Sequence, residues 1–126
     1  MIHRFRLPLY GSKVTVYIHG NTKDALRAFE KKYNVEVSNG EFMGAMALEL
    51  RGDGDVEFVM IFSGEATEAE IAHECLHTAW NIIALLGIGA SPKNHEAQAY
   101  ILGSLVENTY KAFDRYDSSR NPRGTD

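Results

Sequence analysis

The sequence predicts an α+β fold, in which a small, mostly antiparallel sheet packs against a helical hairpin. Up to about residue 63, apolar and polar residues alternate or form short β-rich runs, interrupted by one amphipathic stretch. From residue 67 onward, the apolar residues recur with a helical period. A chain of 126 residues can bury one hydrophobic core. We therefore expect a single domain over residues 1–113 and a polar, flexible tail over residues 114–126.

The first third of the chain predicts a strand, with a possible hairpin partner, and then a helix. A Gly-Ser turn at 11–12 separates two β-rich runs, and the second run alternates apolar with more polar residues. The segment 21–34 has the pattern of a short amphipathic helix, because its apolar residues fall near one face. Asn21 or Thr22 can cap its start, and Asn34 suits its end.

Residues 35–63 predict a small antiparallel meander. Turn signals at 38–40 and 52–54 separate three β-rich runs. The last run, 56–62, is almost continuously apolar, which is typical of a strand buried on both faces. The meander therefore supplies most of the predicted sheet.

Two helices are predicted after this sheet. Thr67 and Glu70 have the spacing of a capping box, and Gly87 suits the end of the first helix. A short turn leads to Pro92, which is tolerated at the first position of a second helix that we expect to end near Phe113. Because the connecting turn is short, the second helix should return antiparallel beside the first.

The first of these helices carries the sequence His-Glu-Cys-Leu-His at 73–77. Residues four apart share a helical face, so His73 and His77 can direct both imidazoles at one ion. Glu74 follows the first histidine, on the side where a metal-bound water would lie. This spacing predicts two zinc ligands and a general base on one turn of helix. The alternative is a set of ordinary polar residues on a solvent-exposed helix.

A catalytic zinc ion needs a third protein ligand and one open position for water. His77 lies about ten residues before Gly87, and Glu96 lies about nine residues after it. In a helical hairpin, two such positions are expected at nearly the same height. Glu96 is therefore the predicted third ligand of one zinc ion per chain. His95 is the alternative ligand, but it points about a quarter-turn away.

The segment from residue 73 to about residue 107 resembles the thermolysin-type gluzincins. Their second active-site helix carries an N-E-A-type motif followed by a G-x-L-V-E-like segment. The corresponding residues here are HEA at 95–97 and GSLVE at 103–107. In overall size, the chain is most similar to compact one-domain minigluzincins and to small bacteriophage-encoded zincins.

This resemblance implies a zinc-dependent metallopeptidase, with zinc as its cofactor. Carried over residue by residue, the family pattern makes His73, His77 and Glu96 the zinc ligands. Glu74 becomes the catalytic base that activates the zinc-bound water and then protonates the leaving amine. The expected partner is a peptide or protein substrate.

Two further roles follow from the resemblance. Larger gluzincins place an Asp one helical turn after the glutamate ligand, where this chain has Tyr100. Tyr100 is therefore the expected catalytic partner, which would hydrogen-bond a zinc-binding histidine or stabilise an oxyanion. Larger enzymes draw a transition-state-stabilising side chain from a further domain, and here Tyr100, Tyr110 or His95 would have to serve.

The topology of the family also implies a substrate-binding edge strand around residues 43–48. Its first residues would pair with the backbone of an extended peptide, and the predicted substrate-binding residues are Met43, Gly44, Ala45 and Met46. Elsewhere on the helix, Cys75 and Trp80 are expected in the hydrophobic core, because Cys75 points away from both histidines and Trp80 lies one turn beyond Leu76.

Composition narrows the class of partner. The chain has 13 Lys and Arg against 17 Asp and Glu, a net charge of −4, which argues against a nucleic-acid partner. It has no apolar run of the length that spans a bilayer and no signal-peptide pattern at its start. A single cysteine cannot form an intramolecular disulfide, so we expect a reducing cytoplasm, that of the host if the protein is encoded by a phage.

A second function remains open at this point. A zincin scaffold can bind zinc without catalysis, as a structural or interaction protein, because zinc ligands alone do not supply transition-state stabilisation. The sequence does not decide the oligomeric state or the identity of the substrate.

Overall fold

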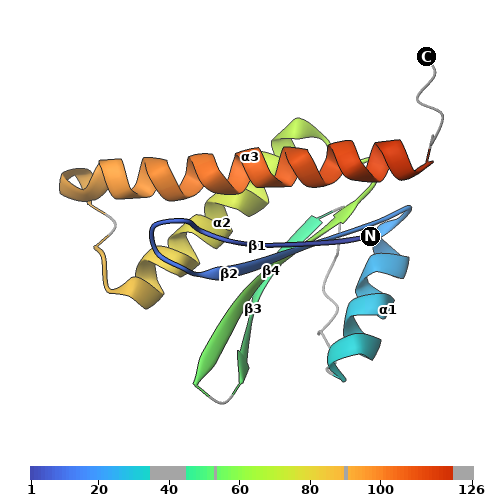
Figure 1. The fold of residues 1–126 in the computed structure, drawn as a ribbon, viewed down its shortest axis with the longest axis horizontal. Coiled ribbons are helices and arrows are strands. Elements are labelled where there is room, and N and C mark those ends of the chain that lie inside the picture. The colour runs from blue at the N-terminus through green and yellow to red at the C-terminus, as the bar shows by residue number, and fades with distance from the viewer. Residues whose placement is uncertain (35–44, 53, 90, 121–126) are drawn as a thin grey trace.

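The computed structural model describes residues 1–34, 45–52, 54–89 and 91–120 (Figure 1). It has an α+β fold, as the sequence predicts. The elements are, in chain order, β1 (Ile2–Arg6), β2 (Lys13–His19), α1 (Thr22–Tyr33), β3 (Ala45–Gly52), β4 (Asp55–Ser63), α2 (Glu68–Leu86), the short 3-10 helix η1 (Pro92–Asn94) and α3 (His95–Arg120).

The four strands form one mixed sheet in the order β1-β2-β4-β3. β1 pairs antiparallel with β2, and β3 pairs antiparallel with β4, so the prediction of a mostly antiparallel sheet is confirmed. The central pair, β2 and β4, is parallel. A parallel pair is normally buried on both faces, and the middle of each of these strands is indeed buried without interruption, over 14–18 and 58–62.

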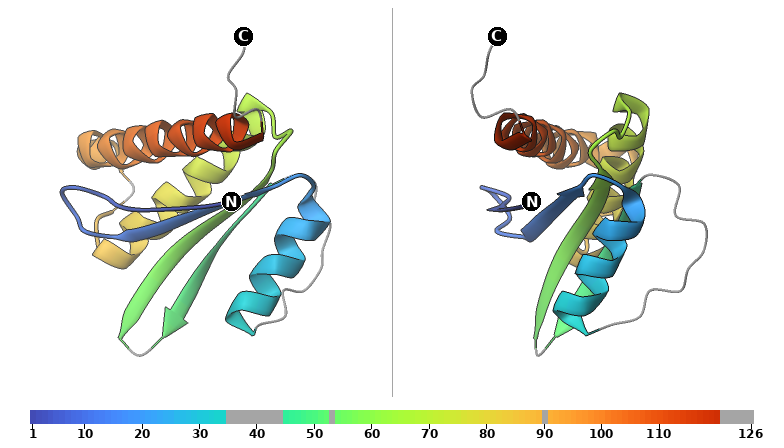
Figure 2. Two further views of the ribbon diagram at one scale, coloured as in Figure 1. Left: turned by 45° about the vertical axis from the view of Figure 1, so that its right-hand side comes forward. Right: turned by 90° about the vertical axis from the view of Figure 1, so that its right-hand side faces the viewer.

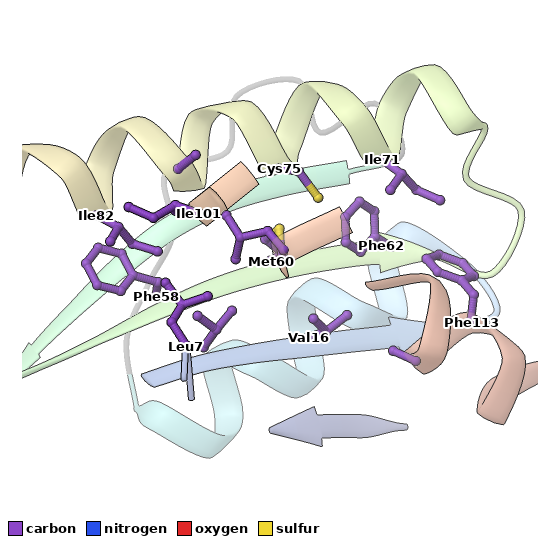
Figure 3. Close-up of a cluster of buried hydrophobic side chains, with 14 of the residues drawn as sticks. Leu7, Val16, Phe58, Met60, Phe62, Ile71, Cys75, Ile82, Ile101 and Phe113 are labelled. Atoms are coloured by element: carbon purple, nitrogen blue, oxygen red, sulfur yellow. The ribbon is translucent and has the colours of Figure 1, made fainter. Parts of the chain in front are cut away.

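Helices cover both faces of the sheet (Figures 1 and 2). α2 and α3 lie over one face, and α1 lies over part of the other. The larger core fills the space between the sheet and the α2–α3 pair (Figure 3), where its members include Phe58, Met60, Phe62, Ile71, Cys75, Ile82 and Ile101. On the α1 face, a smaller core joins Phe29 of α1 to three strand residues, Tyr17, Val59 and Ile61.

The first two helices begin and end where the sequence predicts. The Asn21 side chain accepts a hydrogen bond from the backbone N–H of Asp24, and Asn34 ends α1 in a left-handed conformation. The capping box of Thr67 and Glu70 is present at the start of α2, and Gly87 ends that helix. These local signals need no tertiary contact to act, which explains why they can be read from the sequence.

The predicted boundary at residue 113 is wrong. α3 continues to Arg120, so residues 114–120 belong to the helix, and only 121–126 of the predicted tail lie outside the described residues. This stretch is mostly polar, but it contains one residue of the hydrophobic core. Tyr116 is 7% exposed, and its ring packs into the larger core. A single buried ring on the inner face supports two further helical turns.

The start of α3 also differs from the prediction. Pro92 opens η1 rather than α3, and the Ser91 side chain makes no capping hydrogen bond. The segment 87–94 therefore separates α2 from α3, and it is longer than the turn expected from the sequence. In the described part of the chain, none of the helices is both long enough and apolar enough to cross a membrane.

Candidate functional site

The histidine pair lies on the solvent-facing side of α2. The core face of this helix is marked by Cys75, which is fully buried and follows His73 by two residues. Since successive residues are about 100° apart on a helix, His73 and His77 both fall about 160° from Cys75. Both histidines are exposed, so the motif is open to a ligand from solvent.

The two imidazoles face each other at the distance of a metal-binding pair. Nε2 of His77 lies 3.0 Å from Nε2 of His73, and the ring centroids are 4.6 Å apart. Two nitrogens bound to one tetrahedral zinc ion at about 2.0–2.1 Å would lie about 3.3 Å apart. The rings would have to separate by only a few tenths of an ångström to share an ion, so this pair fits zinc.

Glu74 lies beside the pair but is much less accessible. Its residue is 9% exposed, because it lies on the flank of α2 that packs toward the sheet. Burial raises the pKa of the Glu74 carboxyl, and the neighbouring His73 and His77 partly oppose that shift. A carboxyl group held in this setting binds a proton more readily than a fully solvated one, which suits a general base.

Glu96, the predicted third ligand, is not gathered with the histidines. Its side chain is 93% exposed, and its Oε1 atom lies 3.8 Å from Nδ1 of the adjacent His95. Within the residues that the structure describes, no group of three or more His, Cys, Asp or Glu side chains is arranged to hold a metal ion. Of the predicted ligand set, the structure brings two members together.

The register of the two helices explains the position of Glu96. Cys75 of α2 contacts Thr109 of α3 through Sγ and Oγ1, 3.6 Å apart. Nearer the loop, Ile83 and Ala99 line one small cavity. If the two helices run antiparallel, residue for residue, from these two points, the α3 residues opposite the histidines fall at about 105–111, and Glu96 lies roughly 14–22 Å farther along the helix axis.

The prediction that Glu96 lies opposite the histidine pair differs from the structure in its position along α3. Spacing of about 100° per residue puts Glu96 on the outer side of α3, as it puts the histidines on the outer side of α2. The prediction counted nearly equal numbers of helical residues on either side of Gly87. In the structure α2 ends at Leu86 and α3 begins only at His95, so the residues between them do not add to the length of either helix. The helices also diverge toward that loop, as both Figure 1 and Figure 2 show, so its end of α3 lies farther from α2.

The two tyrosines named from the sequence lie ten residues apart on α3, with Tyr100 in its first two turns and Tyr110 near its middle. Tyr100 is 39% exposed, and its ring packs edge-on against Tyr10 with the centroids 6.0 Å apart. It therefore faces the turn between β1 and β2. Tyr110 is level with His73 by the same register and is 38% exposed. Burial, followed by the charge of Glu68, raises the pKa of its phenol.

The predicted substrate strand is an edge strand. Among the described residues, β3 pairs with β4 along one side only, and it packs against α2. Ala45 and Met46 are its first two residues and are half-buried. Met43 and Gly44 lie outside the described residues. β3 thus has a backbone edge beside the motif helix to which an extended peptide could add as a strand.

Trp80 was predicted in the core, and that prediction is wrong. Trp80 is 51% exposed and Leu76 is 48% exposed, and both lie next to the histidines along α2. Together with Leu102 of α3 they line a cavity of about 100 Å³ in the wedge between the helices. The sequence signal was available, since Trp80 lies three residues after His77 and so shares its side of the helix.

Comparisons of the chain with protein-family profiles, with curated proteins and with solved structures found no match. Its function therefore has to be inferred from the geometry of the site.

Proposed function

We propose that the protein is a zinc-dependent metallopeptidase that hydrolyses peptide bonds. The observation that carries this proposal is the pair of facing imidazoles, His73 and His77, with Nε2 atoms 3.0 Å apart on the exposed face of α2. The largely buried carboxyl of Glu74 lies on the same helical turn. This combination of two ligands and a base is what metal-assisted hydrolysis requires of one helix.

The proposed site consists of zinc ligands and a general base. His73 and His77 would hold one zinc ion per chain, and Glu96 is the third ligand that the sequence suggests. When bound, zinc lowers the pKa of a bound water and polarises a carbonyl oxygen. Glu74 would accept the proton from the attacking water and return it to the leaving amine.

Glu96 is the weakest member of this set. In the structure its carboxylate is almost fully exposed and lies away from the histidine pair. Coordination by Glu96 would require its end of α3 to approach α2. Tyr100 contacts Tyr10 and would have to leave that contact to reach the site, whereas Tyr110 lies level with His73 and is the better-placed phenol to stabilise an oxyanion.

The substrate would be an extended peptide or an exposed protein segment. Backbone pairing along the edge of β3 that faces away from β4 would orient it, starting at Ala45 and Met46. We further propose that the protein acts in a reducing cytoplasm and binds no nucleic acid. The fully buried, unpaired thiol of Cys75 and the net charge of −4 support these two statements.

Metal content tests the ligand set. Protein purified without chelator should contain about one zinc per chain, and the variants His73→Ala and His77→Ala should retain only a small fraction of it. Glu96→Gln should weaken zinc affinity about 10- to 100-fold, whereas the matched variant Glu107→Gln, which is level with the histidines but forms a surface pair with Lys111, should not. Equal zinc affinity in the two glutamine variants would remove Glu96 from the set.

Activity is tested separately from metal binding. Glu74→Gln should keep zinc and lose peptide hydrolysis by about 100-fold or more, because the amide cannot accept the water proton. An unchanged rate in zinc-loaded Glu74→Gln would contradict the mechanism.

A zinc-binding protein without catalysis is the second candidate. The exposed position of Glu96 favours it, because a histidine pair lacking a third protein ligand is a weaker zinc site. Zinc bound by the wild-type protein, with no hydrolysis of any peptide in a diverse library, would select this candidate.

A further inference from the structure

Thr78 of α2 has a buried hydroxyl group. The residue is 1% exposed, and its Oγ1 atom has almost no accessible surface. Among the described residues, this Oγ1 makes no hydrogen bond. A hydroxyl transferred from water to such a place loses its solvent partners and gains none, so valine, which has nearly the same shape, would cost less there.

Thr109 on the neighbouring helix shows what a structural threonine does in this fold. It too is fully buried, and its Oγ1 donates to the backbone carbonyl of Leu105, one turn earlier, at 2.7 Å. The same oxygen lies 3.6 Å from Cys75 Sγ. Thr78 has the equivalent carbonyl one turn earlier, that of Glu74, and does not bond to it. The Thr78 hydroxyl is therefore directed elsewhere.

By helical spacing, the nearest buried polar side chain is that of Glu74. The two residues are four apart, so their side chains lie one above the other on the same flank of α2. Both are buried in an otherwise apolar stripe, and by the same spacing this flank faces away from α3. Glu74 is also the residue that the proposed function assigns as general base.

We infer that Thr78 is a positioning residue for Glu74, and that its hydroxyl gains a partner only when the site is occupied. In that state Oγ1 donates a hydrogen bond to the Glu74 carboxylate, directly or through one water, and fixes the orientation of that carboxylate on the flank of α2 beside His73 and His77. The inference rests on the proposed function. It explains why the resting fold retains a polar atom that does not stabilise it.

The test compares stability with activity in three variants. Thr78→Val should keep or raise the urea midpoint of the metal-free protein, because it removes an unpaired buried hydroxyl. Thr109→Val, the matched control, should lower that midpoint, because it breaks the hydrogen bond to Leu105. Thr78→Ser keeps the hydroxyl and should hydrolyse a reporter peptide within about twofold of wild type.

The decisive measurement is whether Thr78→Val changes kcat or KM in the zinc-loaded protein. Thr78→Val should lower kcat about tenfold and leave KM within about twofold, since a misplaced base affects the chemical step more than binding. A midpoint that falls as far as in Thr109→Val overturns the inference, because the hydroxyl then stabilises the fold. An unchanged kcat overturns it as well. A wild-type protein that hydrolyses no peptide overturns the proposed function, and the inference with it.

Discussion

At the scale of single residues, Cys75 lies inside the histidine motif, but its thiol is expected to be unreactive. Its side chain is fully buried, and burial raises the pKa of the thiol to about 11. The reactive form of cysteine is the thiolate, so at pH 8 only about one thiol in a thousand is ionised. Cys75 lies two residues from each histidine, yet it points into the core (Figure 3).

Native protein should therefore resist alkylation of Cys75. At pH 8, iodoacetamide should label the folded protein at least 100-fold more slowly than the urea-unfolded protein, as measured by intact mass over time. Removal of zinc with a chelator should not change that ratio, because the thiol faces away from the histidine pair. Rapid labelling of the chelated, folded protein would mean that the start of α2 opens.

At the scale of the elements, the turn between β4 and α2 sets how closely α3 can approach. Gly64 lies in this turn, and a Cβ atom built there would lie 2.6 Å from Cε2 and 2.7 Å from the hydroxyl oxygen of Tyr116. The Tyr116 ring is buried and cannot move without disturbing the end of α3. Gly64 is thus needed for contact between two elements that are distant in sequence.

Gly64→Ala should destabilise the protein by about 1–3 kcal/mol in urea unfolding, because it overpacks this junction. Gly20→Ala is the matched control, since a Cβ atom at Gly20 meets no atom within 4 Å. The helical signal of residues 114–120 should weaken in the Gly64 variant. Equal midpoints for the two alanine variants would show that the Tyr116 ring moves freely.

The elements also show what the sequence could and could not predict. The ends of α1 and α2 were predictable because Asn21, Thr67 and Gly87 act through hydrogen bonds within a few residues. The facing histidines were predictable for the same reason, since four-residue spacing is a local property of a helix. The height of Glu96 was not, because it depends on the path of the loop 87–94 and on how far the two helices diverge.

At the scale of the whole molecule, His3 joins the first strand to the last helix. This residue of β1 accepts a hydrogen bond at Nδ1 from the Arg115 guanidinium of α3, 2.7 Å away. Burial and then the positive charge of Arg115 lower the pKa of His3, the Asn108 side chain opposes this shift, and the charge of Lys111 lowers the pKa slightly further. The contact ties the first strand to the last helix and requires a neutral imidazole.

The pKa of His19 is lowered as well, first by burial and then by the charge of the N-terminal amine, while Asp24 opposes the shift. For both histidines the unfolded chain binds a proton more readily than the folded one. Their contribution to stability is therefore complete above about pH 6.5 and is lost as the pH falls from there toward the folded-state values. Acidification in this window should weaken the fold.

The urea midpoint of the metal-free protein should accordingly decrease between pH 7.5 and pH 5.5, measured in chelator so that zinc binding by His73 and His77 does not contribute. His3→Gln should flatten this dependence, because the amide oxygen can accept from Arg115 without titrating. His95→Gln, which replaces a ring that is 73% exposed, is the control and should keep the wild-type slope. If the urea midpoints of His3→Gln and wild type decrease equally over this pH range, protonation of His3 does not weaken the contact between β1 and α3. His19 must then account for the whole effect.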